Sequence, residues 1–171
     1  MTLLHDLHPQ ALRIATALRA RKQRIAVADG ATGGLIMASL LTVPGALEFF
    51  KGGGVVYSFK ARNVLFDLPR EAYDGMTSAT EEYALLQARG IRDRMGASWG
   101  IAESGSAGSS RHPMGVVSGR SVAAIVGPGV ERVAVTETAS DDRIANMEAF
   151  TKNALDLAER VLSEGGLGNS A

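Results

Sequence analysis

The chain has 171 residues, 46% of them hydrophobic and 21% charged, which excludes a disordered chain and predicts one globular domain over residues 1–171. Its 18 basic residues balance its 18 acidic residues, so no nucleic-acid partner is expected. The absence of cysteine excludes disulfides, thiolate metal sites and a cysteine nucleophile. No apolar stretch approaches the ~20 residues needed to span a bilayer, and Met1–His8 lacks a signal pattern, so we expect a cytoplasmic protein without membrane contact.

The first half of the chain alternates helical and strand patterns. Apolar residues repeat at helical spacing from Pro9 to Lys22, with Pro9 placed in the first turn of the predicted helix. The next predicted elements are a buried strand at 25–28, a helix at 35–41, a strand at 55–59, and a helix that starts at a capping box at 78–81 and ends at Gly96.

The second half is strand-rich and ends in a long helix. Short strands are predicted at 98–102, 116–117, 122–126 and 132–136. A final helix is capped by Ser140 or Asp141, buries an apolar face that begins at Ile144, and ends at Gly165 and Gly166, with frayed residues beyond. Alternating elements followed by a meander predict a three-layer α/β fold with a mixed sheet.

Two glycine-rich loops follow predicted strands, at Asp29–Gly34 and at Glu103–Ser110. Ligands of open α/β sheets bind where strands end, and glycine lets backbone N–H groups approach them closely. Turn chemistry alone would explain one such loop, whereas two favour a pocket. Neither loop matches a dinucleotide fingerprint or a Walker A loop, and no cofactor is expected.

The first loop carries a resemblance to a known family. Residues 29–35 read Asp-Gly-Ala-Thr-Gly-Gly-Leu and resemble the A-E-S-C-T-G-G-L signature of the CinA C-terminal domain, the nicotinamide-nucleotide amidohydrolase family. Further motifs of that family match in order, namely V-P-G at 43–45, F-x-G-G at 50–53, V-x-Y-S at 55–58 and P-x-G at 113–115. Ala61-Arg62 stands where the family has Ala-Lys, and residues 102–108 lie over its V-T-G-I-A-G-P. The resemblance covers about residues 9–163 and implies an α/β/α sandwich that forms homo-oligomers.

The family's chemistry depends on two side chains that this chain lacks. The resemblance implies hydrolysis of the carboxamide of nicotinamide mononucleotide by a serine nucleophile with a nearby lysine as base. Gly30 occupies the serine position and Arg62 the lysine position, and a guanidinium does not deprotonate in proteins. Tyr57 and Thr32 stand where the family has them.

Our first hypothesis is a catalytically degraded member that keeps a pocket for a small molecule, such as a pyridine mononucleotide. Arg62 would grip a phosphate or carboxylate, or would instead pair with Asp29 or Glu103. The pocket is predicted to lie between Asp29–Gly34, Tyr57–Arg62 and Ser104–Ser110. Its predicted ligand-binding residues are Asp29, Gly30, Ala31, Thr32, Gly33, Tyr57, Ser58, Arg62, Ser104, Gly105 and Gly108.

Two other hypotheses stay open. The nucleophile could have moved to Thr32, Ser58 or Ser104, assisted by Tyr57 or Glu103. A buried Glu103 would have a raised pKa and could act as a general base. Alternatively, the homo-oligomer itself could be the function.

The remaining candidate residues carry weaker signals. His5 and His8 have metal-ligand spacing but no partners, so no metal is expected. His112 could contact a ligand beside the second loop, while Trp99 and Phe59 are predicted in the core.

Overall fold

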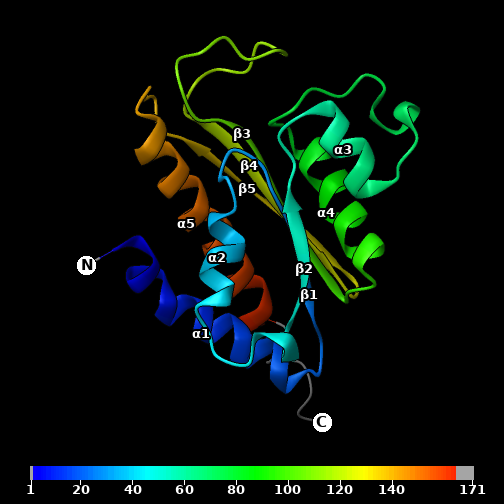
Figure 1. Cartoon of the computed structure of the whole chain (residues 1–171), viewed down its shortest axis with the longest axis vertical. Coiled ribbons are helices and arrows are strands. Elements are labelled where there is room, and N and C mark those ends of the chain that lie inside the picture. Colours follow the sequence, from blue (N-terminus) through cyan, green and yellow to red (C-terminus); the bar gives the residue numbers. More distant parts are fainter. Residues whose placement is uncertain (1, 165–171) are drawn as a thin grey trace.

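A mixed five-stranded sheet forms the centre of the computed structural model, which describes residues 2–164 (Figure 1). Its spatial order is β2-β1-β3-β4-β5. The first three of these strands run parallel, and β4 runs antiparallel to both of its neighbours, β3 and β5. The strands are β1 (Ile25–Asp29), β2 (Phe50–Val55), β3 (Trp99–Ser106), β4 (Arg120–Gly127) and β5 (Val130–Glu137). The predicted mixed sheet is therefore confirmed.

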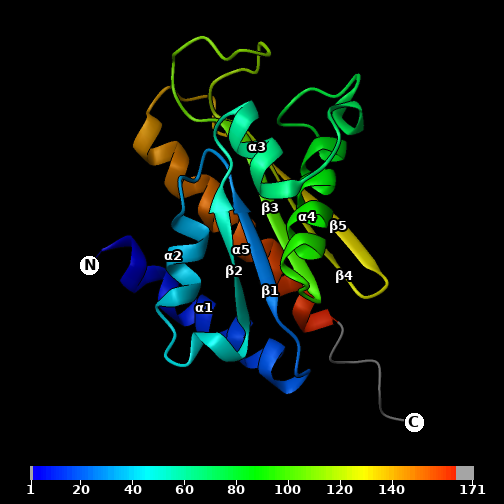
Figure 2. The same ribbon diagram turned by 45° about the vertical axis from the view of Figure 1, so that its right-hand side comes forward.

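Helices cover both faces of the sheet. On one face lie α1 (Leu3–Ala20), α2 (Leu35–Leu41) and α5 (Arg143–Glu164), and on the other α4 (Glu81–Met95), with α3 (Phe59–Phe66) beside it (Figure 2). Each face buries its own apolar cluster, one including Leu18, Phe49 and Phe150 and the other Tyr83 and Ile91. Short 3-10 helices occur at Ala46–Glu48 and Arg70–Tyr73. This arrangement confirms the predicted three-layer α/β/α sandwich.

The parallel part of the sheet determines where a site could form. Asp29 pairs with Val55 of β2, and Ala28 pairs with Ala102 of β3. Parallel strands end at the same edge of a sheet, so the chain leaves β1 and β2 side by side, with β3 continuing just beyond them. The two glycine-rich segments and the start of α3 consequently meet above this edge.

The second strand along the chain lies earlier than the predicted residues 55–59. Strand β2 uses the glycine run that ends with Gly54, and it stops at Val55. A Cβ on Gly53 would overlap the backbone carbonyl of Val27, so only glycine permits this close approach to β1. Ser58 begins α3 instead, its Oγ accepting a hydrogen bond from the Ala61 N–H at 3.1 Å. Phe59 is therefore 53% exposed and not a core residue, whereas Trp99 is buried as predicted.

Two helix starts also differ from the prediction. Helix α1 begins at Leu3 and contains Pro9 in its interior, because Leu7 is buried and His8 Nδ1 contacts Thr42 Oγ1 at 3.0 Å. These tertiary contacts offset the cost of an interior proline. The capping box predicted at 78–81 does not form, because α4 begins at Glu81 directly after Thr80 and the Ser78 hydroxyl contacts His112 Nε2 at 3.4 Å instead. Gly96 ends α4 with φ 58°, as predicted.

The C-terminal half has three further corrections. Strand β3 continues through Ser106, because its serine and glycine residues complete a backbone ladder with β4. Val116 and Val117 lie in no strand. Asp142, not Ser140 or Asp141, accepts the N-terminal hydrogen bond of α5, from the Ala145 N–H at 3.0 Å, and Ile144 is 72% exposed.

The last residue that the structure describes, Glu164, is still part of helix α5. The predicted helix end at Gly165 and Gly166, and the frayed residues after it, lie outside the described residues. None of the helices within residues 2–164 has both the length and the hydrophobicity that a membrane span requires.

Candidate functional site

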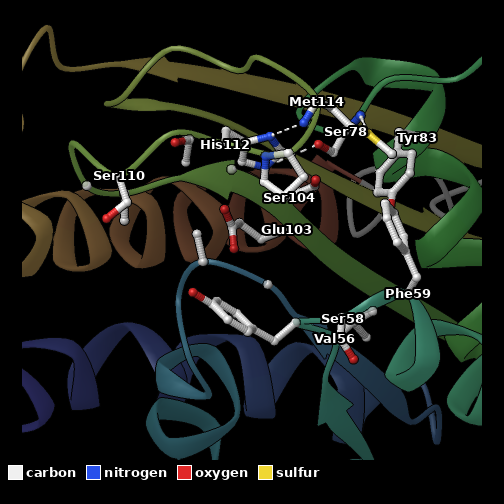
Figure 3. A pocket seen from close by; sticks show the side chains of 18 of the residues that line it. Val56, Ser58, Phe59, Ser78, Tyr83, Glu103, Ser104, Ser110, His112 and Met114 are labelled. Atoms are coloured by element: carbon white, nitrogen blue, oxygen red, sulfur yellow. Dashed lines mark hydrogen bonds between the residues drawn. The ribbon is translucent and has the colours of Figure 1, made fainter.

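A cavity of about 410 Å³ opens at the edge where the parallel strands end (Figure 3). Its size falls within the range of small-molecule sites. Of the predicted ligand-binding residues, those that line it are Gly30, Ala31, Tyr57, Ser58, Ser104, Gly105 and Gly108. Asp29, Thr32, Gly33 and Arg62 do not line it. The structure thus brings the three predicted segments together, while the part of each residue in binding stays a prediction.

Asp29 lies beneath the cavity and is completely buried. Its Oδ1 accepts hydrogen bonds from the Thr32 hydroxyl at 2.6 Å and the Ile36 N–H at 3.1 Å, and its Oδ2 accepts from the Met37 N–H at 3.2 Å. Burial raises the pKa of Asp29, and these hydrogen bonds oppose the shift. The carboxyl group therefore anchors the loop after β1 to α2.

Glu103 is the second buried carboxyl and does line the cavity. Its Oε2 accepts from the Thr32 N–H at 3.0 Å and lies 3.1 Å from the Thr32 hydroxyl, and the Ser121 hydroxyl donates to Oε1. Burial raises the pKa of Glu103, and the nearby charge of Asp29 adds to the shift. Thr32 has one hydroxyl proton for two carboxyl oxygens, so the cluster favours a state in which one carboxyl is protonated.

Gly30 lies directly against β3. A Cβ at this position would overlap the backbone carbonyl oxygen of Glu103 and lie 3.1 Å from its Oε2. A serine at position 30 would therefore require the loop or β3 to move. The carboxyl of Glu103 occupies the space beside the position where the resemblance places a nucleophile.

Arg62 is only 7% exposed and packs against aromatic rings. Its guanidinium carbon lies 3.5 Å from the centre of the Tyr73 ring and 5.0 Å from that of Phe59, and its Nη1 donates to the Tyr83 hydroxyl at 3.4 Å. Within residues 2–164 it forms no ion pair, so neither expected partner, Asp29 or Glu103, is engaged. Arg62 supports the cavity wall formed by Phe59 and Tyr83.

The candidate replacement nucleophiles are already engaged in structural hydrogen bonds. Thr32 is buried under Asp29 and Glu103, Ser58 caps α3, and Ser104 Oγ accepts from the Ala79 N–H at 3.0 Å. Of these three candidates, only Thr32 has a hydroxyl that contacts a carboxyl group, with its Oγ1 2.6 Å from Asp29 Oδ1 and 3.1 Å from Glu103 Oε2. Tyr57 is 74% exposed, and its hydroxyl accepts from Arg143 Nη2 at 3.2 Å.

Several lining residues were not predicted from the sequence. Ser78 lies in the loop before α4 and Tyr83 in its first turn, Arg111 and Met114 lie in the loop after β3, and Arg143 begins α5. Single serines and arginines in loops carry no local signal of a shared site. His112, predicted as a possible ligand contact, does line the cavity.

The N-terminal histidines lie far along the chain from these segments and have other contacts. His5 Nδ1 contacts the Thr2 hydroxyl at 2.7 Å, and His8 contacts Thr42. In the part of the chain that the structure describes, no group of three His, Asp or Glu side chains is placed to hold a metal ion.

Comparison with known proteins gives consistent matches. A model of the CinA C-terminal domain matches residues 8–162. A CinA-like protein of Myxococcus xanthus is 35% identical over 139 residues, which cover 77% of this chain and 32% of that protein. One from Desulforapulum autotrophicum is 34% identical over 151 residues, 85% of this chain and 35% of that protein. The chain thus spans about a third of the length of these relatives.

Solved structures match along nearly the whole chain. The crystal structure of a competence-damaged protein (CinA) superfamily protein from Klebsiella pneumoniae has a TM-score of 0.83 at 25% identity, covering 92% of this chain and 98% of that one. A competence/damage inducible protein from Agrobacterium tumefaciens shares the fold with a TM-score of 0.82 at 22% identity, covering 92% and 96%. The resemblance noted in the loop motifs is confirmed, and this chain belongs to the CinA C-terminal domain family.

Proposed function

We propose that this chain binds a small anionic molecule of the pyridine mononucleotide type and does not hydrolyse it by serine–lysine chemistry. The observation that carries the proposal is a cavity that persists where both reacting side chains are missing. Gly30 lines it without room for a side chain, and Arg62 is buried in its wall. Binding without that chemistry is the function that this geometry supports best.

The lining of the cavity suggests the class of ligand. Val56, Tyr57, Phe59 and Tyr83 provide apolar and aromatic surface suited to a flat ring. Arg111 and Arg143 also line it, and neither has a carboxylate within ion-pair distance in residues 2–164. Two uncompensated cations favour an anionic group such as a phosphate.

The test is binding of nicotinamide mononucleotide, measured by calorimetry and by thermal shift, with ammonia release assayed in the same samples. We expect ligand-dependent stabilisation without ammonia. An Arg111→Gln/Arg143→Gln double variant should bind at least about tenfold more weakly, because two charge-assisted contacts are lost. Arg132→Gln, on β5 and outside the cavity lining, is the matched control and should bind normally. Absence of binding by the unmodified protein would refute the proposal.

A second candidate function, amide hydrolysis by a relocated nucleophile, is favoured by the contact between Thr32 and Glu103. In that case the wild-type protein would release ammonia from nicotinamide mononucleotide, with Glu103 taking the proton of Thr32 or of a water. Thr32→Val and Glu103→Gln would then abolish turnover. Ser58→Ala and Ser104→Ala would separate the other two candidate nucleophiles.

Homo-oligomerisation is a separate proposal. Strand β2 lies at one edge of the sheet, and exposed apolar side chains occur on and near it, at Leu41, Leu47 and Val55. Sedimentation velocity over a dilution series tests this proposal. If dilution dissociates and unfolds the protein without any effect of the nucleotide, assembly itself would be the better description of the function.

A further inference from the structure

A short chain of hydrogen bonds runs along one wall of the cavity. The Met114 N–H donates to His112 Nδ1 at 3.1 Å, and His112 Nε2 lies 3.4 Å from Ser78 Oγ (Figure 3). All three residues line the cavity. Ser78 is held in place by its neighbour Ala79, a non-glycine residue with φ 56° whose N–H donates to Ser104 Oγ.

The backbone amide determines the tautomer of His112. An amide N–H only donates, so Nδ1 must accept with its lone pair, and the proton of the neutral ring sits on Nε2. His112 therefore donates to Ser78 Oγ. Burial lowers the pKa of His112, and a second proton on Nδ1 would face the Met114 N–H directly.

This direction leaves the proton of Ser78 available. Ser78 is 9% exposed, and its hydroxyl has no other hydrogen-bond partner in residues 2–164. Because Nε2 already carries a proton, His112 is not placed to activate Ser78 as a nucleophile. The hydroxyl can instead donate its proton in a hydrogen bond to an acceptor inside the cavity.

We propose that Ser78 donates a hydrogen bond to an acceptor oxygen of the cavity ligand, with His112 as the positioning residue that directs it. This inference rests on the proposed binding function and adds a specificity-determining contact. A donor at this wall selects molecules that present a carbonyl, carboxylate or phosphate oxygen there. Successive bonds from Met114 through His112 polarise the Ser78 hydroxyl and strengthen its donation.

Other charged groups face the same space and set the background for any pH dependence. The titratable and charged residues that line the cavity with His112 are Tyr57, Tyr83, Glu103, Arg111 and Arg143. Variants of His112 separate its contribution to the pH dependence from theirs, because only protonation of His112 breaks the hydrogen bond that the Met114 N–H donates to Nδ1.

The first experiment needs no ligand. Long-range ¹H–¹⁵N spectra at pH 7 report the tautomer of each histidine, and the chain has three. We expect His112 to be neutral with its proton on Nε2, assigned by its loss in His112→Gln. A proton on Nδ1, or an imidazolium at this pH, would overturn the direction of the hydrogen bonds.

The second experiment measures the affinity for nicotinamide mononucleotide. Ser78→Ala should weaken binding about three- to tenfold with unchanged thermal stability. Ser163→Ala, an exposed serine on α5 that does not line the cavity, should not change it. Equal affinities of wild type and Ser78→Ala would refute the contact. If the wild type does not bind, the proposed function fails, and the ligand contact fails with it, while the spectra still decide the tautomer.

The role of His112 has its own readout. His112→Gln keeps an amide donor near the Nε2 position, so it should retain most of the affinity, whereas His112→Ala should match Ser78→Ala. Wild-type binding should weaken as the pH falls below the ordinary histidine pKa of about 6.5, because burial lowers the pKa of His112 from that value. Binding by His112→Gln should weaken less, since only the ligand's phosphate, whose second pKa is about 6, then titrates in this range. A pH profile shared by wild type and His112→Gln would show that His112 does not position Ser78.

Discussion

The two glycine-rich segments at the cavity differ sharply in how they are held. The loop after β1, residues 30–34, is fixed by the buried side chains Asp29, Thr32 and Glu103. The segment after β3, residues 107–119, rises away from the sheet, and its backbone hydrogen bonds are local or at its ends, such as Gly115 N–H to His112 O and Gly119 N–H to Ser106 O (Figure 1). The first forms a rigid floor, and the second forms the rim.

We therefore expect the floor to contribute mainly to folding stability and the rim mainly to ligand binding. Buried polar groups that are fully hydrogen-bonded make the floor costly to alter, whereas exposed loop residues contribute little to folding. Substitutions of the buried groups that hold the floor should therefore destabilise the protein, and substitutions in the rim should change ligand binding with little effect on stability.

The largest effect is expected for Asp29→Ala. Removing the carboxyl leaves the buried Ile36 and Met37 N–H groups without their acceptor and takes one of two acceptors from the Thr32 hydroxyl, which should lower the free energy of unfolding by about 3–5 kcal/mol. Asp29→Asn retains one acceptor oxygen and should lose clearly less. Urea denaturation of both variants measures the difference, and equal losses would contradict the anchoring role.

A smaller loss is expected for Gly30→Ala. Its Cβ would overlap the Glu103 carbonyl oxygen, and the required shift of the loop should cost about 2–3 kcal/mol. Ala31→Ser, next to it in the cavity lining, should change the urea midpoint little. A Gly30→Ala variant as stable as the wild type would show that the loop does not pack closely enough against β3 to exclude a Cβ.

The pH dependence of stability sharpens the same contrast. Burial raises the pKa of both Asp29 and Glu103, so the folded state binds more protons than the unfolded chain. Their contribution is fully present below the ordinary carboxyl pKa of about 4, and it is lost as pH rises through the raised folded-state values. Glu103→Gln should flatten this decline in denaturation series from pH 5 to 9, whereas Glu71→Gln, an exposed control, should reproduce the wild-type slope.

The smallest change in stability is expected in the rim. Arg111→Gln removes an exposed charge without an ion-pair partner in residues 2–164, so the free energy of unfolding should stay within about 0.5 kcal/mol of wild type. Its affinity for nicotinamide mononucleotide should still fall. A loss of stability comparable to that of Gly30→Ala would mean that the rim is as tightly held as the floor.

Sequence patterns predicted most elements but misplaced some that depend on distant partners. The helix at 35–41 and the strand at 25–28 carry local periodicity and were predicted closely. The glycine-rich strand β2 was missed, because its stability comes from pairing with β1 and not from its own propensities. Pro9 inside α1 was missed for the same reason, since contacts of Leu7 and His8 outweigh the local preference.

By itself, the order of motifs determined the family and the layered fold, and it placed two glycine-rich segments at one edge of a sheet. These features follow from local turn chemistry and from the direction of parallel strands. Only the tertiary structure decided three contacts. Gly30 packs directly against Glu103, the Arg62 guanidinium packs on the Tyr73 ring, and Ser78 contacts His112. Those partners lie far apart along the chain, and their contacts arise from how the layers pack.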